Sequence, residues 1–422
     1  MKKGFLKRMF PFKGKAAKTL GTFSSAAFLN DTGEEMFAPY LPLFATVFLH
    51  MTPEQYGLME GIVEALNRAL RAFTGTLSDR WSRKLPVALG YILISISRIL
   101  LAPIHLWYWL VPARGVRQIG RAFRDPAREA SIADNVEPDL RGKGFGLLNA
   151  VDTMGAIIGP FIGLLILSLI SFGYLSFSVE NRFSEHAFRW VFVLAAIPTF
   201  CSAMVIWKFL PDTRPGQPTG DIGQKGKNQD THGFLAGIKK YLADPKVRNM
   251  TLSNVILAIG AVPISMMLLY VYDRFSVSAT VGGILFVVYS VAHFLTSYPA
   301  GGVADRLGGR KTQLLGILFL VASFVSLILA PGPLWCAISF IFYASFDSLW
   351  LVNRRAVMST LAPPDRRGQY LGTFSTLYGL SSFIAPVLAG IIWHRVSPHA
   401  AFITACIIAG ISIFFMPSVV KR

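Results

Sequence analysis

The stretch Gly75-Thr-Leu-Ser-Asp-Arg-Trp-Ser-Arg-Lys84 follows an apolar segment, and a similar stretch, Gly301-Gly-Val-Ala-Asp-Arg-Leu-Gly-Gly-Arg-Lys311, follows another one later in the chain. The two stretches share one register with a constant offset of 226, which joins Gly75 to Gly301, Asp79 to Asp305 and Arg80 to Arg306. The same offset joins Arg128 to Arg354, Pro138-Asp139 to Pro364-Asp365, Gly146 to Gly372, and Pro160 to Pro386. A gap-free register over roughly 85 residues predicts a chain built from two similar halves.

The composition is that of a membrane protein. Of the 422 residues, 53% are hydrophobic and only 15% are charged, whereas soluble domains carry about 25% charged residues. Apolar runs near the roughly 20 residues of a spanning helix recur along the chain, and clear examples are 144–171, 190–210, 314–330 and 400–416. No polar stretch is long enough to form a separate soluble domain.

We therefore expect an all-α membrane protein with twelve transmembrane helices in two pseudo-symmetric six-helix bundles. The expected helices are 22–49, 56–78, 86–105, 107–128, 144–171, 188–210, 250–272, 279–301, 314–331, 333–358, 367–394 and 398–417. Residues 211–230 are rich in Pro, Gly, Gln and Asp, which is typical of a flexible linker. The expected domains are an N-terminal bundle at 1–210, a cytoplasmic linker with a short amphipathic helix at 211–249, and a C-terminal bundle at 250–422. A parallel repeat places the substrate site between the halves, near the bilayer midplane.

The distribution of positive charge predicts the topology. The formal net charge is +18, from 41 Lys and Arg against 23 Asp and Glu, and most bases lie in alternate segments between the apolar runs. Such segments face the cytoplasm, so both termini are expected to be cytoplasmic, in a bacterial inner membrane that the chain crosses many times. No nucleic-acid-binding fold has room to form, so nucleic acid is not an expected partner.

The two repeated stretches resemble the signature loop of the major facilitator superfamily of secondary transporters, and the resemblance covers essentially the whole chain. It implies a cytoplasmic gate whose residues are Gly75, Asp79, Arg80, Arg83, Gly301, Asp305, Arg306 and Arg310. A carboxylate interacts well with the positive N-terminus of a helix. Asp79 is therefore expected near Gly368, and Asp305 near Gly142, so that each latches the two halves together. The alternative is that these charges only fix the topology.

A second motif lies on the expected fifth helix. Gly155, Gly159, Pro160 and Gly163 resemble the family motif of exporters that exchange substrate for protons, although Leu164 stands in its last place. The stretches 30–42 and 128–134 resemble bacterial drug- and metabolite-efflux members. These resemblances imply efflux by antiport. Plain helix packing, which small residues permit, is the alternative explanation of the fifth-helix motif.

Three acids on the expected first helix are candidates for proton coupling. Asp31, Glu34 and Glu35 are spaced to share one helical face, and charges at membrane depth mark function because a lipid-facing charge is costly. A carboxylate in apolar surroundings can exchange a proton near neutral pH. The hypothesis is that one of them, foremost Asp31 or Glu35, carries the proton. The alternative is a structural ion pair with an arginine of the same half.

Arginines on the next helices suggest an anionic substrate. Glu64 can pair with Arg68 one turn away, but Arg98, Arg114, Arg117 and Arg121 are too many for the acids of the first two helices to neutralise. This surplus positive field favours an anionic or carboxylate-bearing substrate. The alternatives are that Arg117 and Arg121 reach the cytoplasmic surface, and that Asp152 on the fifth helix neutralises Arg114.

The C-terminal half offers fewer polar candidates. His293 matches Asn67 at the same offset of 226, and Asp347 matches Arg121. Polar residues at matched positions are good candidates for a shared cavity. The resulting candidates for the cavity and substrate are Glu64, Asn67, Arg68, Arg114, Asp152, His293 and Asp347. A hydrogen-bonded packing role is the alternative for His293.

Other classes of protein lack their sequence signatures. The chain has no GxxxxGK[ST] phosphate loop, no HExxH, and no paired Cys and His ligands, so neither ATP-driven transport, nor an enzyme, nor a metal site is expected. We expect a monomeric secondary transporter that moves a small solute by alternating access, with a proton gradient as its energy source and no cofactor. Proton-coupled efflux is the first expectation. Proton-coupled uptake of an anionic metabolite or metal-chelate is the second, and a non-transporting receptor is the third.

Overall fold

A computed structural model of the chain describes residues 12, 14–78, 83–137, 140–174, 183–211, 241–361 and 367–417. In those ranges the regular structure is helical throughout. The helices of the first half are α2 (Gly14–Glu35), η1 (Ala38–Tyr40), α3 (Leu41–Val47), α4 (Pro53–Ser78), α5 (Lys84–Leu101), η2 (Trp107–Trp109), α6 (Leu110–Asn135), α7 (Arg141–Phe172) and α8 (Glu185–Phe209). Those of the second half are α10 (Pro245–Gly260), α11 (Ile264–Phe275), α12 (Ala279–Leu307), α13 (Gly309–Leu329), η4 (Pro333–Trp335), α14 (Cys336–Leu361), α15 (Arg367–Ser381), α16 (Ile384–Arg395) and α17 (Pro398–Phe415).

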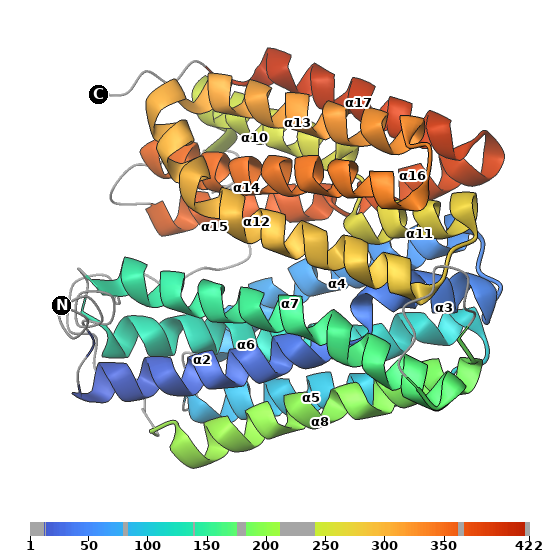
Figure 1. Cartoon of the computed structure of the whole chain (residues 1–422). Helices are drawn as coiled ribbons and strands as arrows, with labels where there is room; N and C mark the ends of the chain where they lie inside the picture. Colours follow the sequence, from blue (N-terminus) through green and yellow to red (C-terminus); the bar gives the residue numbers. More distant parts are fainter. Residues whose placement is uncertain are drawn as a thin grey trace, which may run out of the picture.

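The helices form two bundles that lie against each other (Figure 1). Helices α2 to α8 make one bundle, and α10 to α17 make the other. Counting α2 with α3, α10 with α11, and α15 with α16 as single crossings, the described chain makes the twelve crossings of the expected fold. Helix α2 begins and helix α17 ends at the same end of the molecule, which we call the terminal end (Figure 1). We call the opposite end the distal end.

The internal repeat is visible in the helix boundaries. Four elements of the first half, α4, η2, α6 and α7, begin at positions that the offset of 226 relates to the first residues of α12, η4, α14 and α15. Helices α6 and α14 also end at positions related by this offset, Asn135 and Leu361. The two-bundle fold predicted from the sequence register is therefore confirmed. Helices α8 and α17, which start at Glu185 and Pro398, do not keep the offset, because the segments before them differ in length.

Three of the expected single helices are interrupted. The first crossing breaks between α2 and α3, where Pro39 and Pro42 lack the N–H groups that would continue the helix. The seventh breaks between α10 and α11, just before Ile264, where Pro263 is extended with φ −66° and ψ 151°. The eleventh breaks between α15 and α16. The prediction of an unbroken helix at 22–49 is wrong for this reason, and α2 also begins earlier, at Gly14.

The start of α4 is set by a capping box that precedes the expected start at residue 56. The backbone N–H of Gln55 donates to Thr52 Oγ1 at 3.2 Å, and the backbone N–H of Thr52 donates to Gln55 Oε1 at 2.9 Å. These reciprocal bonds satisfy amide groups that have no partner inside the helix. They hold the short connection between α3 and α4 at the distal end.

Three crossings of the first half are more polar than the others. Nine helical segments of the described chain are long and apolar enough to cross a membrane. Helices α2, α4 and α6 are not among them, because they carry the internal charges of the first half. A charged helix avoids lipid by turning its charges toward the protein interior. The composition of the helices thus directs attention to α2, α4 and α6 as the walls of a polar interior.

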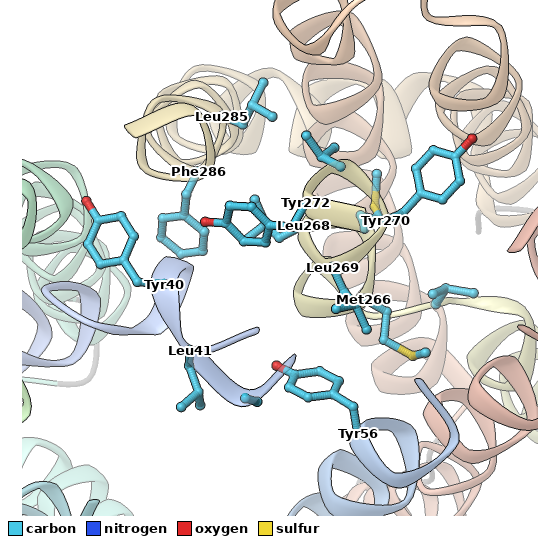
Figure 2. Close-up of a cluster of buried hydrophobic side chains, with 14 of the residues drawn as sticks. Tyr40, Leu41, Tyr56, Met266, Leu268, Leu269, Tyr270, Tyr272, Leu285 and Phe286 are labelled. Atoms are coloured by element: carbon cyan, nitrogen blue, oxygen red, sulfur yellow. The ribbon is translucent and has the colours of Figure 1, made fainter. Parts of the chain in front are cut away.

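The two bundles meet closely at the distal end. Tyr272 of α11 donates a 2.9 Å hydrogen bond from its hydroxyl to the carbonyl of Pro39 in η1. A Cβ atom on Gly283 of α12 would lie 2.6 Å from the hydroxyl of Tyr40, so only a glycine permits this approach. Figure 2 shows Tyr40 and Tyr272 on either side of Phe286. These contacts form a buried layer between the bundles, which we call the distal seal.

A second crossing at the distal end also depends on glycine. Gly57 of α4 faces the backbone of Pro386 in α16, and Gly390 faces Pro53, whose carbonyl oxygen would lie 2.5 Å from an added Cβ atom. Helices α4 and α16 therefore touch backbone to backbone. In this structure the two bundles are closed against each other at the distal end.

Candidate functional site

A polar cavity of about 590 Å³ lies among α2, α5, α6 and α7. Its volume is within the range of small-molecule sites, about 300–1,000 Å³. The described residues that line it all belong to the first bundle: Asn30, Asp31, Glu34, Glu35, Ile94, Arg117, Arg121, Arg124, Asp125, Arg128, Glu129, Leu148, Asn149 and Asp152. Two of the four contributing helices, α2 and α6, are the polar crossings identified above. We call this space the acid–arginine cavity.

Glu34 is held between two arginines. Arg117 Nη2 lies 2.6 Å from Glu34 Oε1, and Arg98 Nη2 lies 3.0 Å from Glu34 Oε2. The side chain of Arg98 is completely buried and that of Glu34 is 14% exposed. Two guanidinium groups at this distance favour the ionised carboxylate. Glu34 therefore takes the structural ion-pair role that was the alternative for this residue.

Arg98 connects three helices of the first bundle. Its Nη1 donates to the carbonyl of Ala195 at 2.9 Å and to the hydroxyl of Thr199, both on α8. Its Nη2 donates to the carbonyl of Asn30 at 3.0 Å. Gly33 leaves the space that the guanidinium occupies, because an added Cβ atom would collide with Arg98 Nη1. This network fixes α2, and with it the acids on α2, against α5 and α8.

Three other acids of the cavity have no ion pair with a described residue. Asp31 accepts a 2.7 Å hydrogen bond from Asn30 Nδ2. Glu35 Oε2 and Asp152 Oδ1 are buried and have no hydrogen-bond partner among the described residues. An unpaired buried carboxylate is costly in its ionised form. These three acids therefore differ from Glu34 in having no arginine within ion-pair distance among the described residues.

The glycines of the fifth-helix motif position these acids. They recur every fourth residue along α7 and face α2. An added Cβ atom on Gly155 would lie 2.8 Å from the carbonyl of Phe28, and one on Gly159 would lie 2.8 Å from Glu35 Cβ. Tyr40 donates a 2.5 Å hydrogen bond from its hydroxyl to the carbonyl of Pro160. Gly163 likewise faces the backbone of Met36. The motif thus brings α7 against the face of α2 that carries Asp31 and Glu35.

The expected surplus of positive charge is wrong, because the arginines have acidic neighbours. Arg114 Nη1 lies 2.6 Å from Glu60 Oε1, so Glu60 neutralises Arg114 in place of Asp152. Arg124 Nη2 lies 2.7 Å from Asp125 Oδ1. Among the described residues, four arginines and six carboxylates line the acid–arginine cavity. This described lining carries both signs of charge, and when all these groups are ionised the negative charges are in excess.

The surface alternative for Arg117 is also wrong. The side chain of Arg117 is 16% exposed and is paired with Glu34. Arg121 is 32% exposed, lines the cavity and lies 3.8 Å from Asp125 Oδ2. Arg117, Arg121, Arg124 and Arg128 share one face of α6. Sequence reasoning missed the last two as cavity residues, although their helical spacing from Arg117 pointed to the same face.

His293 and Asp347 meet in the second bundle. His293 Nε2 lies 3.5 Å from Asp347 Oδ2, and Tyr289 donates a 3.0 Å hydrogen bond from its hydroxyl to the same oxygen. They do not line the acid–arginine cavity. Helix α12, which carries Tyr289 and His293, nevertheless packs against α7 of the first bundle. His293, Asp347 and Tyr289 therefore form one cluster in the second bundle, whereas Arg121, the repeat partner of Asp347, lines the cavity.

An aromatic cage that the sequence did not reveal surrounds Arg354. The guanidinium carbon lies 4.4 Å from the ring centre of Tyr378 and 5.1 Å from that of Trp350. Trp350 in turn donates a 3.0 Å hydrogen bond from its Nε1 to Asn254 Oδ1. Arg354 is the repeat partner of Arg128, which lines the acid–arginine cavity. The two halves therefore hold matched arginines in different surroundings.

Several predicted residues lie outside the described part of the chain. Asp79 and Arg80 are not described, and neither are the side chains of Asn67, Arg68 and Asp305. The latches and the pairing of Glu64 with Arg68 remain predictions. The surroundings of four of the predicted gate residues are described. Arg83 is buried, Gly301 has open space around it, and Arg306 and Arg310 are exposed.

Two helical bundles with a charged cavity among their polar crossings define a polytopic membrane transport protein. The family model described as Major Facilitator Superfamily matches residues 23–272 and 250–422, and the chain belongs to this superfamily. It is accordingly a transporter and not an enzyme.

Its relatives in sequence are transport proteins of microorganisms. The chain is 27% identical over 401 residues to the uncharacterised MFS-type transporter MJ1317 of Methanocaldococcus jannaschii, covering 94% of this chain and 93% of that protein. It is 23% identical to the class C tetracycline resistance protein of Escherichia coli, covering 86% and 87%. It is 25% identical to the quinolone resistance protein NorA of Staphylococcus aureus, again covering 86% and 87%.

Solved structures share the fold at low identity. A bacterial homologue of the human lysosomal transporter Spinster, in an inward-facing and unoccupied conformation, aligns with a TM-score of 0.75 and 17% identity, covering 96% of this chain and 97% of that one. The nucleoside transporter NupG aligns with a TM-score of 0.67 and 14% identity, covering 94% and 97%.

Proposed function

We propose that this transporter is a proton-coupled exporter of a small solute. The observation that carries the proposal is the set of three acids, Asp31, Glu35 and Asp152, that line one cavity without an arginine partner among the described residues. Such acids exchange protons, whereas Glu34 stays ionised between Arg98 and Arg117. Protonation and cargo binding then compete for the same space, and this competition is the physical basis of antiport.

Alternating access would give the cargo a route across the membrane. The distal seal closes one end, and rocking the bundles about the cavity would open it and close the terminal end. The cytoplasmic latches at Asp79 and Asp305 would hold the second state. We place the terminal end, and so both chain termini, in the cytoplasm of a bacterial inner membrane. The division into bundles at 1–210 and 250–422, joined by a cytoplasmic linker at 211–249, and the monomeric state belong to the same proposal.

The cavity favours a cargo that carries both charges. Arg121 and Arg128 can bind a carboxylate, and an unprotonated Asp31 or Asp152 can bind an amine. Relatives of this chain are named for resistance to tetracycline and to quinolones, so a tetracycline and a quinolone are the first probes to use. Export of these compounds would agree with the helix-five motif at Gly155, Gly159, Pro160 and Gly163.

The test is substrate-driven proton flux in proteoliposomes that contain only the full-length protein. Each probe is added to vesicles that enclose a pH-sensitive dye, and proton movement is recorded with wild type and with Asp31→Asn, Glu35→Gln and Asp152→Asn. At least one substitution should abolish proton movement while the protein still exchanges labelled probe across the membrane. Unchanged coupling in all three variants would refute the role of these acids.

One observation favours the opposite direction of transport, which is uptake into the cell. Once Asp31, Glu35 and Asp152 are protonated, the four arginines that line the cavity outnumber its three other described carboxylates, which suits an anionic metabolite or a metal-chelate taken up together with protons. Adding an outward-directed and then an inward-directed pH gradient to the same vesicles separates the two directions. Export requires that probe and proton move in opposite directions. If no tested probe or anion moves under either gradient, the receptor alternative is favoured.

A further inference from the structure

A second cavity lies at the distal end of the molecule, between the bundles. Its volume is about 610 Å³, and sixteen described residues line it. They come from α3 and the start of α4 and α8 in the first bundle, and from α11, α12 and α16 in the second. We call this space the distal vestibule. None of the residues that line the acid–arginine cavity lines the vestibule.

Aromatic rings make up much of the vestibule wall. Five rings line it: Phe48, Phe183, Phe188, Tyr272 and Trp393. Their positions are fixed by packing. The ring centres of Phe48 and Phe188 lie 5.4 Å apart, and the hydroxyl of Tyr272 is bonded to Pro39. Rings held in this way present their faces without losing conformational entropy on binding.

One charged residue, Asp273, lies among the sixteen lining residues. It is exposed, and within the described chain no base forms an ion pair with it. The neighbouring Arg274 is turned away, because its Nη1 donates to Tyr270 Oη at 2.7 Å and to the carbonyl of Ile328 at 2.5 Å. An apolar aromatic pocket with one unneutralised carboxylate is complementary to an apolar cation.

Two arginines on helices that contribute to the vestibule have acidic partners other than Asp273. Arg189 of α8 lies 2.5 Å from Glu185 Oε1 and donates to the carbonyl of Ile104 at 2.8 Å. Arg395 of α16 lies 3.8 Å from Glu54 Oε1. These two arginines are therefore occupied away from Asp273, which leaves its charge available to a ligand.

We infer that the distal vestibule is a binding site for lipophilic cations, in which Asp273 neutralises the charge and the rings of Phe48, Phe188 and Trp393 pack on the apolar body. The site is separate from the acid–arginine cavity, since the distal seal of Tyr40, Tyr272 and Gly283 lies between the bundles at this end. Figure 2 shows Tyr272 beside Phe286, with Leu269 below it on the same helix. The distal seal therefore separates a cation in the vestibule from Glu35.

The test uses tetraphenylphosphonium as the cationic probe and full-length protein in lipid nanodiscs. Equilibrium dialysis should show saturable binding to wild type, and Asp273→Asn should weaken it by about tenfold, the effect expected for losing a charge beside a partly exposed cation. Triphenylphosphine oxide, which has aromatic rings and no net charge, should bind wild type and Asp273→Asn alike. Because Asp273 is exposed, the variant should unfold at the wild-type temperature.

A positional readout locates the probe. Ser276 lines the vestibule and is exposed, so a cysteine in Ser276→Cys should react with N-ethylmaleimide, and saturating tetraphenylphosphonium should slow that reaction several-fold. The natural cysteines, Cys201, Cys336 and Cys406, give the background, which is measured on wild type.

Two results would overturn the inference: equal affinity of wild type and Asp273→Asn for the cation, or an unchanged labelling rate at Ser276→Cys. Asp152→Asn distinguishes this proposal from the proposed function. It should bind tetraphenylphosphonium as wild type does, and a loss of binding in this variant would instead place the cation in the acid–arginine cavity. Failure of the vestibule site would leave the proton-flux experiment unaffected.

Discussion

Arg117 Nη2 lies 2.6 Å from Glu34 Oε1, and this contact joins α6 to α2 at the centre of the first bundle. On its other side Glu34 meets Arg98, which is completely buried. One carboxylate thus serves two guanidinium groups, and the neighbouring acids Asp31 and Glu35 are left without such partners among the described residues. Two acids on one helical turn, Glu34 and Glu35, therefore differ in their surroundings, because among the described residues only Glu34 forms ion pairs with arginines.

Removing the buried arginine should destabilise the protein strongly. Arg98→Met leaves the carbonyls of Asn30 and Ala195 without their donor and weakens the hold on Glu34. Breaking one partner of a buried ion pair costs about 3–5 kcal/mol. We expect a clear fall in the unfolding temperature measured in detergent. Arg395→Met is the control, because the side chain of Arg395 is 70% exposed and surface pairs contribute at most about 1 kcal/mol.

Enlarging a glycine of α7 should separate α7 from α2. In Gly159→Val the first added atom would lie 2.6 Å from the carbonyl of Thr32, so the helices must move apart, at a cost of about 1–3 kcal/mol. Proton-coupled flux should fall together with stability, since Glu35 loses its position. Gly146→Val lies on the same helix with no atom within 4 Å of its Cβ position. If both variants show the same stability and the same proton-coupled flux, the close approach of α7 to α2 is not needed for function.

A larger residue at Gly283 should open the distal seal. Gly283→Val pushes against the ring of Tyr40, and the bundles can relieve the clash only by moving apart at this end. Spin labels on the exposed positions Val47 and Val396 should therefore report a longer distance than in the unsubstituted protein. Gly302→Val on the same helix, where there is open space, should leave the distance unchanged. An unchanged distance in Gly283→Val would mean that Tyr40 gives way and the seal does not depend on glycine.

Loss of the capping box should cost a moderate amount of stability. Thr52→Ala removes the oxygen that accepts the N–H of Gln55, and the loss of such a cap costs about 1 kcal/mol. Thr46→Ala, close by in the same half, is the matched control, because its hydroxyl donates only to carbonyls of its own helix turn. A comparable loss of unfolding free energy in both variants would contradict the role of the cap.

Much of the fold could be predicted from the register of the two halves. The constant offset matched α6 with α14, and the start of α7 with the start of α15. The match holds because the chain between the repeated loops has the same length in both halves. The interruptions near Pro39 and Pro263 were harder to foresee. A proline inside an apolar run can bend a helix or end it, and the outcome depends on what the neighbouring helices offer to the freed backbone groups.

The site was predicted in part. Asp31, Glu35 and Asp152 were recognised as acids at membrane depth, and they do line one cavity. Their partners were not predictable, since pairing depends on how α2, α4 and α6 are rotated against each other. Arg114 pairs with Glu60 in place of Asp152 for this reason. A count of charges along the sequence suggested unneutralised arginines, whereas the packed helices bring carboxylates to them.

Every described residue that lines the acid–arginine cavity belongs to a single bundle. If the ion-exchanging chemistry resides there, the opposite bundle, with its caged Arg354 and its cluster of Tyr289, His293 and Asp347, is free to diverge without harming energy conversion. Chimeras that keep residues 1–210 and exchange the second half with that of a related carrier should then retain both the driving force and the preference for a cargo that carries both charges. The two copies of a duplicated ancestral unit would in this way have acquired different functions.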